Sequence, residues 1–438
     1  MAYRQTFTTL FILSLLSFSY AALENPKPTA FHFPIRKNET SLRYYISFES
    51  GTPSQNFIDA LIDLGEQSVW FDCTSYVSSS SKRVSCDSAT CKKTPGSLCS
   101  ECNSRLSPNP GCSNTTCAVL AFNNFRLYFT DQELRQDTMQ VYSTDGWFIR
   151  STYDVPKFQF SCAYSSDITE GFPGDHTKAL AGFARAKLSF PSQIVSSYKL
   201  ANKFALCLPS SSGKGLGDVF IGGGPYFMPP NTEDYSLSLV STPLLVNPVS
   251  TAIYYSEAHS DEYFINVTDI EISGKRVAFS RSLLSFNKSG IGGTKISTLV
   301  PYTILHASIY NRLVKDFVKE AALYKMKRVK SIAPFGACFD SKKIPKTITG
   351  PAVPNIDLVL EGKTVRMRLY GANSMVEVKK NVICLAFIGG GAEPRTSIVL
   401  GGHQLENYIM EFDLSASRLG LSSSLLVWNT SCSHSRLF

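Results

Sequence analysis

A short pattern occurs once in each half of the 438-residue chain. In each half a hydrophobic run ends in a polar turn, at residues 61–65 and 296–299. A segment that reads Ala-Leu-Ala-Gly or Ile-Val-Leu-Gly then follows well downstream, at 179–182 and 398–401. The chain is also too long for one ordinary compact domain and can bury two separate cores. The repeat therefore predicts two lobes with a cleft between them.

Most of the chain has the composition of β-structure. Short runs rich in Val, Ile, Phe, Tyr and Thr, such as 44–48 and 262–267, are separated by Gly, Pro, Ser and Asn. A helix is expected after the second turn, where apolar residues recur at helical spacing: Ile309, Leu313, Phe317 and Ala321. We therefore predict an all-β fold, mainly antiparallel, with few helices.

The ends of the two lobes can also be placed from composition. Residues 1–21 have the pattern of a secretory signal peptide, with Arg4 before an apolar run that is too short to span a bilayer. The Ser-rich stretch 210–212 runs into glycines and reads as a flexible junction. We expect lobes at 22–212 and 213–438, in a secreted chain without a membrane segment.

Twelve cysteines, an even number, favour six disulfides in a secreted chain. Cys99 and Cys102 have the spacing of a metal-ligand pair, but no second pair and no histidine cluster accompanies them, so disulfides are favoured over zinc. No metal or other cofactor is expected. Eight of the cysteines lie between residues 73 and 162: Cys73, Cys86, Cys91, Cys99, Cys102, Cys112, Cys117 and Cys162.

Two surface properties bear on partners. The net charge of +8 favours adsorption to an acidic cell-wall polysaccharide, although ordinary solvation explains it equally well, and it is not concentrated enough to indicate nucleic-acid binding. Five Asn-x-Ser/Thr sequons are candidate glycosylation sites: Asn38, Asn114, Asn266, Asn287 and Asn429.

The first turn, Leu-Ile-Asp63-Leu-Gly, resembles the catalytic turn of pepsin-like aspartic proteases. Those enzymes need two facing carboxylates that share one proton and polarise a water molecule. The second turn reads Lys-Ile-Ser297-Thr-Leu, and a hydroxyl can neither hold the shared proton nor act as a base near neutral pH. Asp63 and Ser297 are therefore interpreted as vestigial positions of a lost catalytic pair.

Other catalytic parts also differ from those of active pepsins. Leu64 stands where an active enzyme has a Thr whose hydroxyl bonds to the opposite lobe, and Leu299 replaces a glycine. No flap motif with a tyrosine is evident between Cys117 and Asp154. No serine-hydrolase elbow, zinc-protease helix or phosphate-binding loop is present. We therefore expect no enzymatic activity.

Several separate segments are similar to one plant group within the pepsin superfamily, which contains extracellular dermal glycoprotein, basic 7S globulin and the xylanase and xyloglucan-endoglucanase inhibitors. The matching segments are 109–112, 114–117, 190–193, 292–298, 329–338 and 400–406. The resemblance implies a bilobal pepsin-like fold, secretion to the apoplast or cell wall and no protease activity. It also implies the disulfides Cys338–Cys384 and Cys207–Cys432, with the other eight cysteines paired among themselves.

In the related inhibitors two places contact the target enzyme, and they correspond here to Lys325 to Arg328 and Leu425 to Ser431. Arg328 matches the position of a glucanase-blocking arginine, although a solvated helix end is an equally simple interpretation. At the second place xylanase inhibitors carry a histidine where this chain has Trp428, and glucanase inhibitors carry an arginine where it has Asn429. Neither known inhibitory residue is therefore intact in the tail.

The resulting hypothesis is a secreted, inactive, pepsin-like glycoprotein that binds and inhibits a microbial cell-wall-degrading glycoside hydrolase, a xyloglucan endoglucanase or a xylanase, in plant defence. One alternative is a storage or ligand-binding glycoprotein without a hydrolase partner. A second alternative is an atypical aspartic endopeptidase that uses Asp63.

Overall fold

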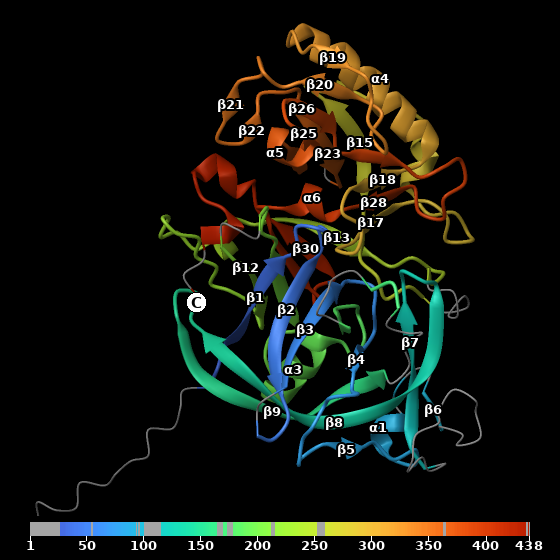
Figure 1. The fold of residues 1–438 in the computed structure, drawn as a ribbon, viewed down its shortest axis with the longest axis vertical. Coiled ribbons are helices and arrows are strands. Elements are labelled where there is room, and N and C mark those ends of the chain that lie inside the picture. Colours follow the sequence, from blue (N-terminus) through green and yellow to red (C-terminus); the bar gives the residue numbers. More distant parts are fainter. Residues whose placement is uncertain are drawn as a thin grey trace, which may run out of the picture.

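The computed structural model describes residues 27–437 except 54–55, 93, 95–96, 100–114, 164–169, 173–177, 212–214, 252–258, 362–364 and 435–436. Figure 1 shows two lobes, a lower one built mainly from the blue to green part of the chain and an upper one built mainly from the yellow to red part. The predicted two-lobed fold, rich in strands and poor in helices, is confirmed.

The elements of the first part of the chain are β1 (Ala30–Lys37), β2 (Tyr44–Ser50), β3 (Asn56–Asp63), β4 (Val69–Asp72), β5 (Lys82–Arg83), α1 (Ala89–Lys92), β6 (Leu98–Cys99), β7 (Cys117–Asn123), β8 (Tyr128–Thr144), β9 (Ile149–Ala163), β10 (Ala179–Gly182), α3 (Phe190–Tyr198), β11 (Lys203–Cys207), β12 (Gly217–Ile221), η2 (Tyr235–Ser238) and β13 (Val240–Leu245).

The elements of the second part are β14 (Phe264–Ile265), β15 (Val267–Ile272), β16 (Lys275–Arg276), η3 (Arg281–Leu284), β17 (Thr294–Ile296), β18 (Thr303–Leu305), α4 (Ala307–Leu323), β19 (Arg328–Val329), β20 (Cys338–Asp340), β21 (Lys346–Thr347), β22 (Gly350–Pro351), β23 (Ile356–Leu360), β24 (Arg366–Leu369), α5 (Gly371–Ser374), β25 (Met375–Lys379), β26 (Val382–Leu385), β27 (Phe387–Gly389), β28 (Ile398–Leu400), α6 (Gly402–Leu405), β29 (Ile409–Asp413), β30 (Arg418–Leu421), η4 (Leu425–Trp428) and η5 (Cys432–His434).

The repeated segments lie beside the two turns. In the first half β10 runs parallel to β3, with Gly182 opposite Asp63, and in the second half β28 runs parallel to β17, with Leu400 opposite Ile296. A Cβ at Gly182 would lie 2.3 Å from the carbonyl oxygens of Glu66 and Ser68, so only glycine fits this crossing. The repeat is therefore the signature of one strand-turn arrangement built twice.

The prediction of a mainly antiparallel fold needs one refinement, because the sheets are mixed. Four strand pairs are parallel: β3–β10, β4–β9, β17–β28 and β18–β27. Most other pairs are antiparallel, including the platform β1–β12–β11–β29–β30–β13 that joins the lobes. Two of the parallel pairs, β3–β10 and β17–β28, contain the strands that end in the two turns, and in each pair the partner strand comes from far along the chain.

The predicted helix is present as α4, and it buries the four residues that define its apolar stripe. The core is continuous from one lobe to the other. Phe204 stacks on Phe412 with ring centroids 4.7 Å apart, and the Tyr263 hydroxyl donates to the carbonyl of Phe183 at 2.7 Å. Aromatic packing of this kind fixes the lobes relative to each other.

Five disulfides close among the described residues: Cys73–Cys162, Cys86–Cys99, Cys91–Cys117, Cys207–Cys432 and Cys338–Cys384. The last two are the pairs that the family resemblance implies. Cys99 is therefore paired with Cys86 in a disulfide and is not available as a metal ligand. Cys102 and Cys112 lie outside the described residues.

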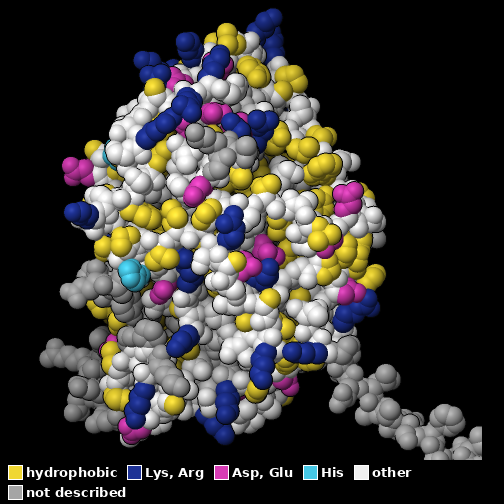
Figure 2. Space-filling model, turned by 180° about the vertical axis from the view of Figure 1, so that it is seen from behind, with side chains coloured by type: hydrophobic (Ala, Val, Ile, Leu, Met, Phe, Trp, Pro, Cys, Tyr) yellow, Lys and Arg dark blue, Asp and Glu magenta, His cyan; other side chains and the backbone are white. Residues whose placement is uncertain are grey.

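The surface carries its positive charge in a dispersed form. Figure 2 shows Lys and Arg side chains spread over one face from one lobe to the other, with acidic side chains between them. Within the described ranges no helix is both long and apolar enough to cross a bilayer.

Candidate functional site

The first turn holds Asp63 at the end of β3, with only 4% of the residue exposed. Its Oδ1 accepts the backbone N–H of Gly65 at 2.8 Å, and its own carbonyl accepts the N–H of Phe183 at 2.7 Å. The backbone of the turn thus fixes the carboxylate in one orientation, facing the cleft.

The second carboxylate oxygen is occupied by a side chain that the sequence did not reveal. Asn124 lies in the turn between β7 and β8, and its Nδ2 donates to Asp63 Oδ2 at 3.0 Å. The β7–β8 hairpin therefore places an amide over the first turn, in the stretch where the sequence shows no tyrosine-bearing flap motif. The Arg43 guanidinium lies 4.8 Å from the ring centroid of Phe125 and donates to the carbonyl of Leu299 at 2.8 Å. Arg43 therefore ties the hairpin to the second turn.

The second turn repeats the geometry of the first with a hydroxyl. Ser297 Oγ accepts the N–H of Leu299 at 3.2 Å, as Asp63 accepts that of Gly65. Thr298 Oγ1 donates to the carbonyl of Ile62 at 2.6 Å, across to the first turn. Leu64 is buried and cannot return this bond. The only side-chain hydrogen bond that Thr298 and Leu64 make between the turns is therefore the one donated by Thr298.

A cavity of about 200 Å³ lies over both turns, and its charged lining consists of four acids and one base: Asp63, Glu66, Asp261, Glu262 and Lys295. Burial raises the pKa of Asp63 to about 6; the Gly65 N–H opposes the rise, and the negative charge of Glu262 adds to it. Burial also raises the pKa of Glu66 to about 8, with a further contribution from the charge of Asp63. Burial therefore favours the protonated form of the Glu66 carboxyl near neutral pH.

Glu262 is the acid that comes from the other half of the chain. A Cβ built on Gly65 would lie 3.0 Å from Glu262 Oε1 and 3.4 Å from Asp63 Oδ1, so the two carboxylates share this cavity. Glu262 is, however, ion-paired with Lys295 Nζ at 2.7 Å and accepts a bond from Ser260 Oγ at 3.2 Å. Among the described residues no hydrogen bond joins the carboxyl groups of Glu262 and Asp63, so this pair of acids is not arranged to share a proton.

The other two acids of the cavity, Asp261 and Glu66, also form hydrogen bonds within the protein. Asp261 accepts the Gln67 amide at 2.7 Å, and Glu66 Oε1 accepts the Gln67 N–H at 3.1 Å. No three His, Cys, Asp or Glu side chains converge as a metal site in the described part of the chain. The Asp63 carboxylate is thus held in place by two donors of the protein itself, the Gly65 N–H and the Asn124 amide.

Two family profiles cover most of the chain. The profile described as Xylanase inhibitor N-terminal matches residues 44–223, and the one described as Xylanase inhibitor C-terminal matches residues 262–423. The chain belongs to this family. It is 44% identical over 411 residues to the Probable aspartic proteinase GIP2 of Nicotiana benthamiana, across 93% of this chain and 92% of the relative. It is 36% identical to Gamma conglutin 1 of Prunus dulcis, across 92% and 90%.

Solved structures give the same assignment. The crystal structure of edgp matches with a TM-score of 0.89 at 40% identity, over 94% of this chain and 99% of that chain. Conglutin gamma from lupine seeds matches with a TM-score of 0.78 at 31% identity, over 93% and 98%. The pepsin-like architecture and the family predicted from the sequence are therefore confirmed.

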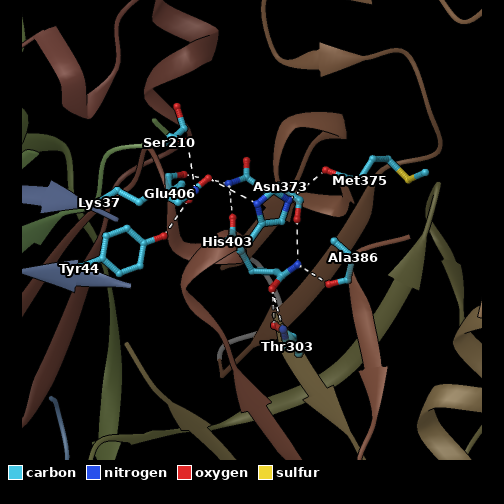
Figure 3. Close-up of polar contacts among 10 residues, drawn as sticks. Lys37, Tyr44, Ser210, Thr303, Asn373, Met375, Ala386, His403 and Glu406 are labelled. Carbon is cyan, nitrogen blue, oxygen red and sulfur yellow. Dashed lines mark hydrogen bonds and ion pairs between the residues drawn. The ribbon is translucent and has the colours of Figure 1, made fainter. Parts of the chain in front are cut away.

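In this xylanase-inhibitor family member the segment 400–406 has a structural role that sequence reasoning missed. Figure 3 shows Glu406 between two residues of the first strands and His403. Glu406 Oε1 accepts from Lys37 Nζ at 2.6 Å and from the Tyr44 hydroxyl at 2.7 Å. Since these partners lie on β1 and β2, the buried ion pair pins the first strands to α6. The segment that carries part of the family resemblance is therefore a clamp between lobes.

Arg328, one inhibitor-loop candidate, is exposed at the start of β19, where it pairs with Phe339. The helix ends earlier, at Leu323, so Arg328 is not part of a solvated helix end. Its guanidinium makes one long contact of 3.5 Å with the carbonyl of Gly336. Most of its donors therefore face solvent and are open to a partner.

Trp428 and Asn429, the tail candidates, lie at the end of η4. Trp428 is 54% exposed, its Nε1 donates to Ser423 Oγ at 2.9 Å, and its carbonyl accepts the Asn231 amide at 3.1 Å. Among the described residues no hydrogen bond or ring contact joins Arg328 to Trp428, so one partner would have to touch both elements separately.

Four of the five sequons can be placed, and none of their asparagines is buried: Asn38, Asn266, Asn287 and Asn429. Asn114 lies outside the described residues. Surface exposure is what a glycan acceptor requires, and occupancy stays a prediction.

Proposed function

We propose that this chain is a secreted, non-catalytic glycoprotein that binds and inhibits a cell-wall-degrading glycoside hydrolase. One observation carries the loss of catalysis: the second turn presents the Ser297 hydroxyl, while both oxygens of Asp63 accept bonds from Gly65 and Asn124. A water molecule between the turns then has one carboxylate and no shared proton, and peptide hydrolysis lacks its acid-base pair.

The proposed partner class follows from the family, which is described by inhibition of xylanases. Glycoside hydrolases carry two carboxyl groups in a sugar-binding cleft. An exposed guanidinium such as that of Arg328 suits those carboxyl groups, and an exposed indole such as that of Trp428 suits a surface that normally stacks on sugar rings. A microbial xyloglucan endoglucanase or xylanase, met in the apoplast during plant defence, fits both features.

The supporting assignments belong to the same proposal. Residues 1–21 act as a signal peptide, lobes extend over 22–212 and 213–438, and the described sequons carry glycans. The dense disulfides suit an oxidising compartment outside the cytosol. The positive surface favours retention on acidic wall polysaccharide.

The test is inhibition of a panel of microbial xylanases and xyloglucan endoglucanases by the purified glycoprotein. We expect slowing of at least one enzyme at micromolar protein, and Arg328→Ala should weaken that inhibition about a hundredfold, as removal of an interface hot spot does. Lys330→Ala, two residues away and also exposed, is the matched control and should leave inhibition unchanged. A panel in which no enzyme is slowed contradicts the proposal.

Similarity to gamma conglutins and to basic 7S globulin from soybean favours a second candidate, a storage or ligand-binding glycoprotein. The same panel separates the two, because a storage protein slows none of the enzymes. Resemblance to a probable aspartic proteinase keeps an atypical Asp63-dependent endopeptidase as a further alternative, which peptide-cleavage assays decide.

A further inference from the structure

The tail before Cys432 holds a modification site next to an exposed aromatic side chain. Asn429 is exposed and follows Trp428 with φ of 54°, a left-handed conformation that ends η4. The next residue, Thr430, is buried, and its hydroxyl donates to the carbonyl of Pro229 at 2.5 Å. Asn429 is therefore held at the surface between an anchored threonine and a half-exposed indole.

Comparison of the described sequons singles out Asn429. Asn38 and Asn287 use their Oδ1 to accept backbone N–H groups of their own turns, at 2.8–3.0 Å. Asn266 uses its Nδ2, the atom that a glycan needs, to bond Glu361 at 3.2 Å. The side chain of Asn429 has no hydrogen bond to any other described residue. A glycan on Asn429 therefore displaces no interaction of the folded protein.

The surroundings of Asn429 are apolar for a protein surface. Val427 is 39% exposed and Trp428 54% exposed. We call Val427 and Trp428, which directly precede Asn429, the tail patch. A stable protein interface needs about 800 Å² on each partner, so a partner that contacts Trp428 also covers the neighbouring Asn429.

We propose that a glycan on Asn429 covers the tail patch and regulates docking of the hydrolase there, an inference that rests on the proposed function. In the secretory pathway Nδ2 attacks the anomeric carbon of a lipid-linked oligosaccharide, the bond to the lipid diphosphate breaks, and an amide proton leaves with that diphosphate. The product is a bulky hydrated chain beside Trp428. The glycosylated form docks weakly at the tail, and the form without this glycan docks through Trp428.

The experiment uses the full secreted protein from a plant host, with occupancy of Asn429 measured by peptide mass spectrometry. Two variants remove the glycan by different changes: Asn429→Gln, and Ser431→Ala, which keeps the asparagine. Ser289→Ala removes the sequon at Asn287 without touching its bonds to the backbone and serves as the control. We expect both tail variants to inhibit the responsive hydrolase at about tenfold lower concentration, and the control to match the parent protein.

A second readout is independent of any hydrolase. Trp70 is fully buried and Trp147 is half-buried, so acrylamide quenching of tryptophan fluorescence reports mainly on Trp428. Native removal of the Asn429 glycan should increase quenching, and the increase should vanish in Trp428→Phe. If no hydrolase is inhibited by any form but quenching still rises, the proposed function fails while coverage of the tail patch stands. An unoccupied Asn429, or quenching and inhibition that are both unchanged by glycan removal, overturns the inference.

Discussion

The two turns of the molecule share one frame and differ in chemistry. Asp63 accepts the Gly65 N–H at 2.8 Å, and Ser297 accepts the Leu299 N–H at 3.2 Å, each beside a parallel strand from a distant segment. The backbone conformation of the turn therefore requires only a side-chain oxygen that accepts a hydrogen bond at residue 63 or 297. Proton sharing needs a carboxyl group at both positions. Folding and catalysis therefore place separable demands on the same residue.

The bridge between the turns shows a second difference. The hydroxyl of Thr298 reaches the first turn, whereas Leu64 makes only apolar contacts at the matching position. A rigid pair of turns is useful when two carboxylates must be held at a fixed distance. A single bond suffices to seat one turn against the other.

The largest expected effect tests whether the backbone crossing beside each turn is equally tight in the two halves of the chain. A Cβ at Gly182 would lie 2.3 Å from two carbonyl oxygens, and a Cβ at Gly401 would lie 2.5 Å from the backbone of Tyr302. Gly182→Ala and Gly401→Ala should each lower the free energy of unfolding by about 3 kcal/mol, because backbone atoms must shift. Denaturant unfolding measures both variants. A loss of stability in only one of the two variants would show that the two turns do not depend on the same backbone arrangement.

The next effect separates the turns by pH. The folded-state pKa of Asp63 is about 6 against an ordinary value of 3.8, so folding favours the protonated acid. Stability associated with Asp63 is therefore fully present below pH ~4 and is lost as pH rises towards 6, by about 2–3 kcal/mol. Asp63→Asn should remove this part of the loss, and Ser297→Ala should not alter it.

Unfolding of each variant between pH 4 and 7 measures this difference. The raised pKa of Glu66, about 8, adds its own loss of stability over a wider pH window. Asp63→Asn should also reduce that loss, because the charge of Asp63 contributes to the Glu66 shift, whereas Ser297→Ala should leave it unchanged. Identical pH profiles for Asp63→Asn and the parent would show that Asp63 titrates normally.

A smaller effect concerns the one-sided bridge. Thr298→Val leaves the carbonyl of Ile62 without its 2.6 Å partner in a buried position and should cost about 1–2 kcal/mol. Thr298→Ser keeps the hydroxyl and should cost much less. Leu64→Thr tests the other side, and a gain in stability from that change would indicate that the lost bond can be rebuilt.

The fold was largely predictable because its signals are local or repeated. Apolar spacing located α4, and the two glycine-containing segments located the strands beside the turns. The parallel pairs were not predictable from composition, since alternation within a strand says nothing about the direction of its neighbour.

The candidate site was predictable only in its main groups. Asp63 and Ser297 stand out because they follow hydrophobic strands in matching contexts. Asn124, Glu262 and Lys295 reach the cavity through loop geometry and pairing between distant segments, and an isolated asparagine or ion pair carries no spacing that marks it. Glu406 was quoted as part of a motif, but its bond to Lys37 depends on the joining of both lobes.

Peptide cleavage by the purified mature protein between pH 3 and 6 tests the central claim most directly, with the parent and Asp63→Asn measured side by side on a denatured protein substrate. The account predicts that both proteins release no more peptide than a blank reaction. Cleavage by the parent that disappears in Asp63→Asn would contradict it, because the lone carboxylate would then have found a working partner.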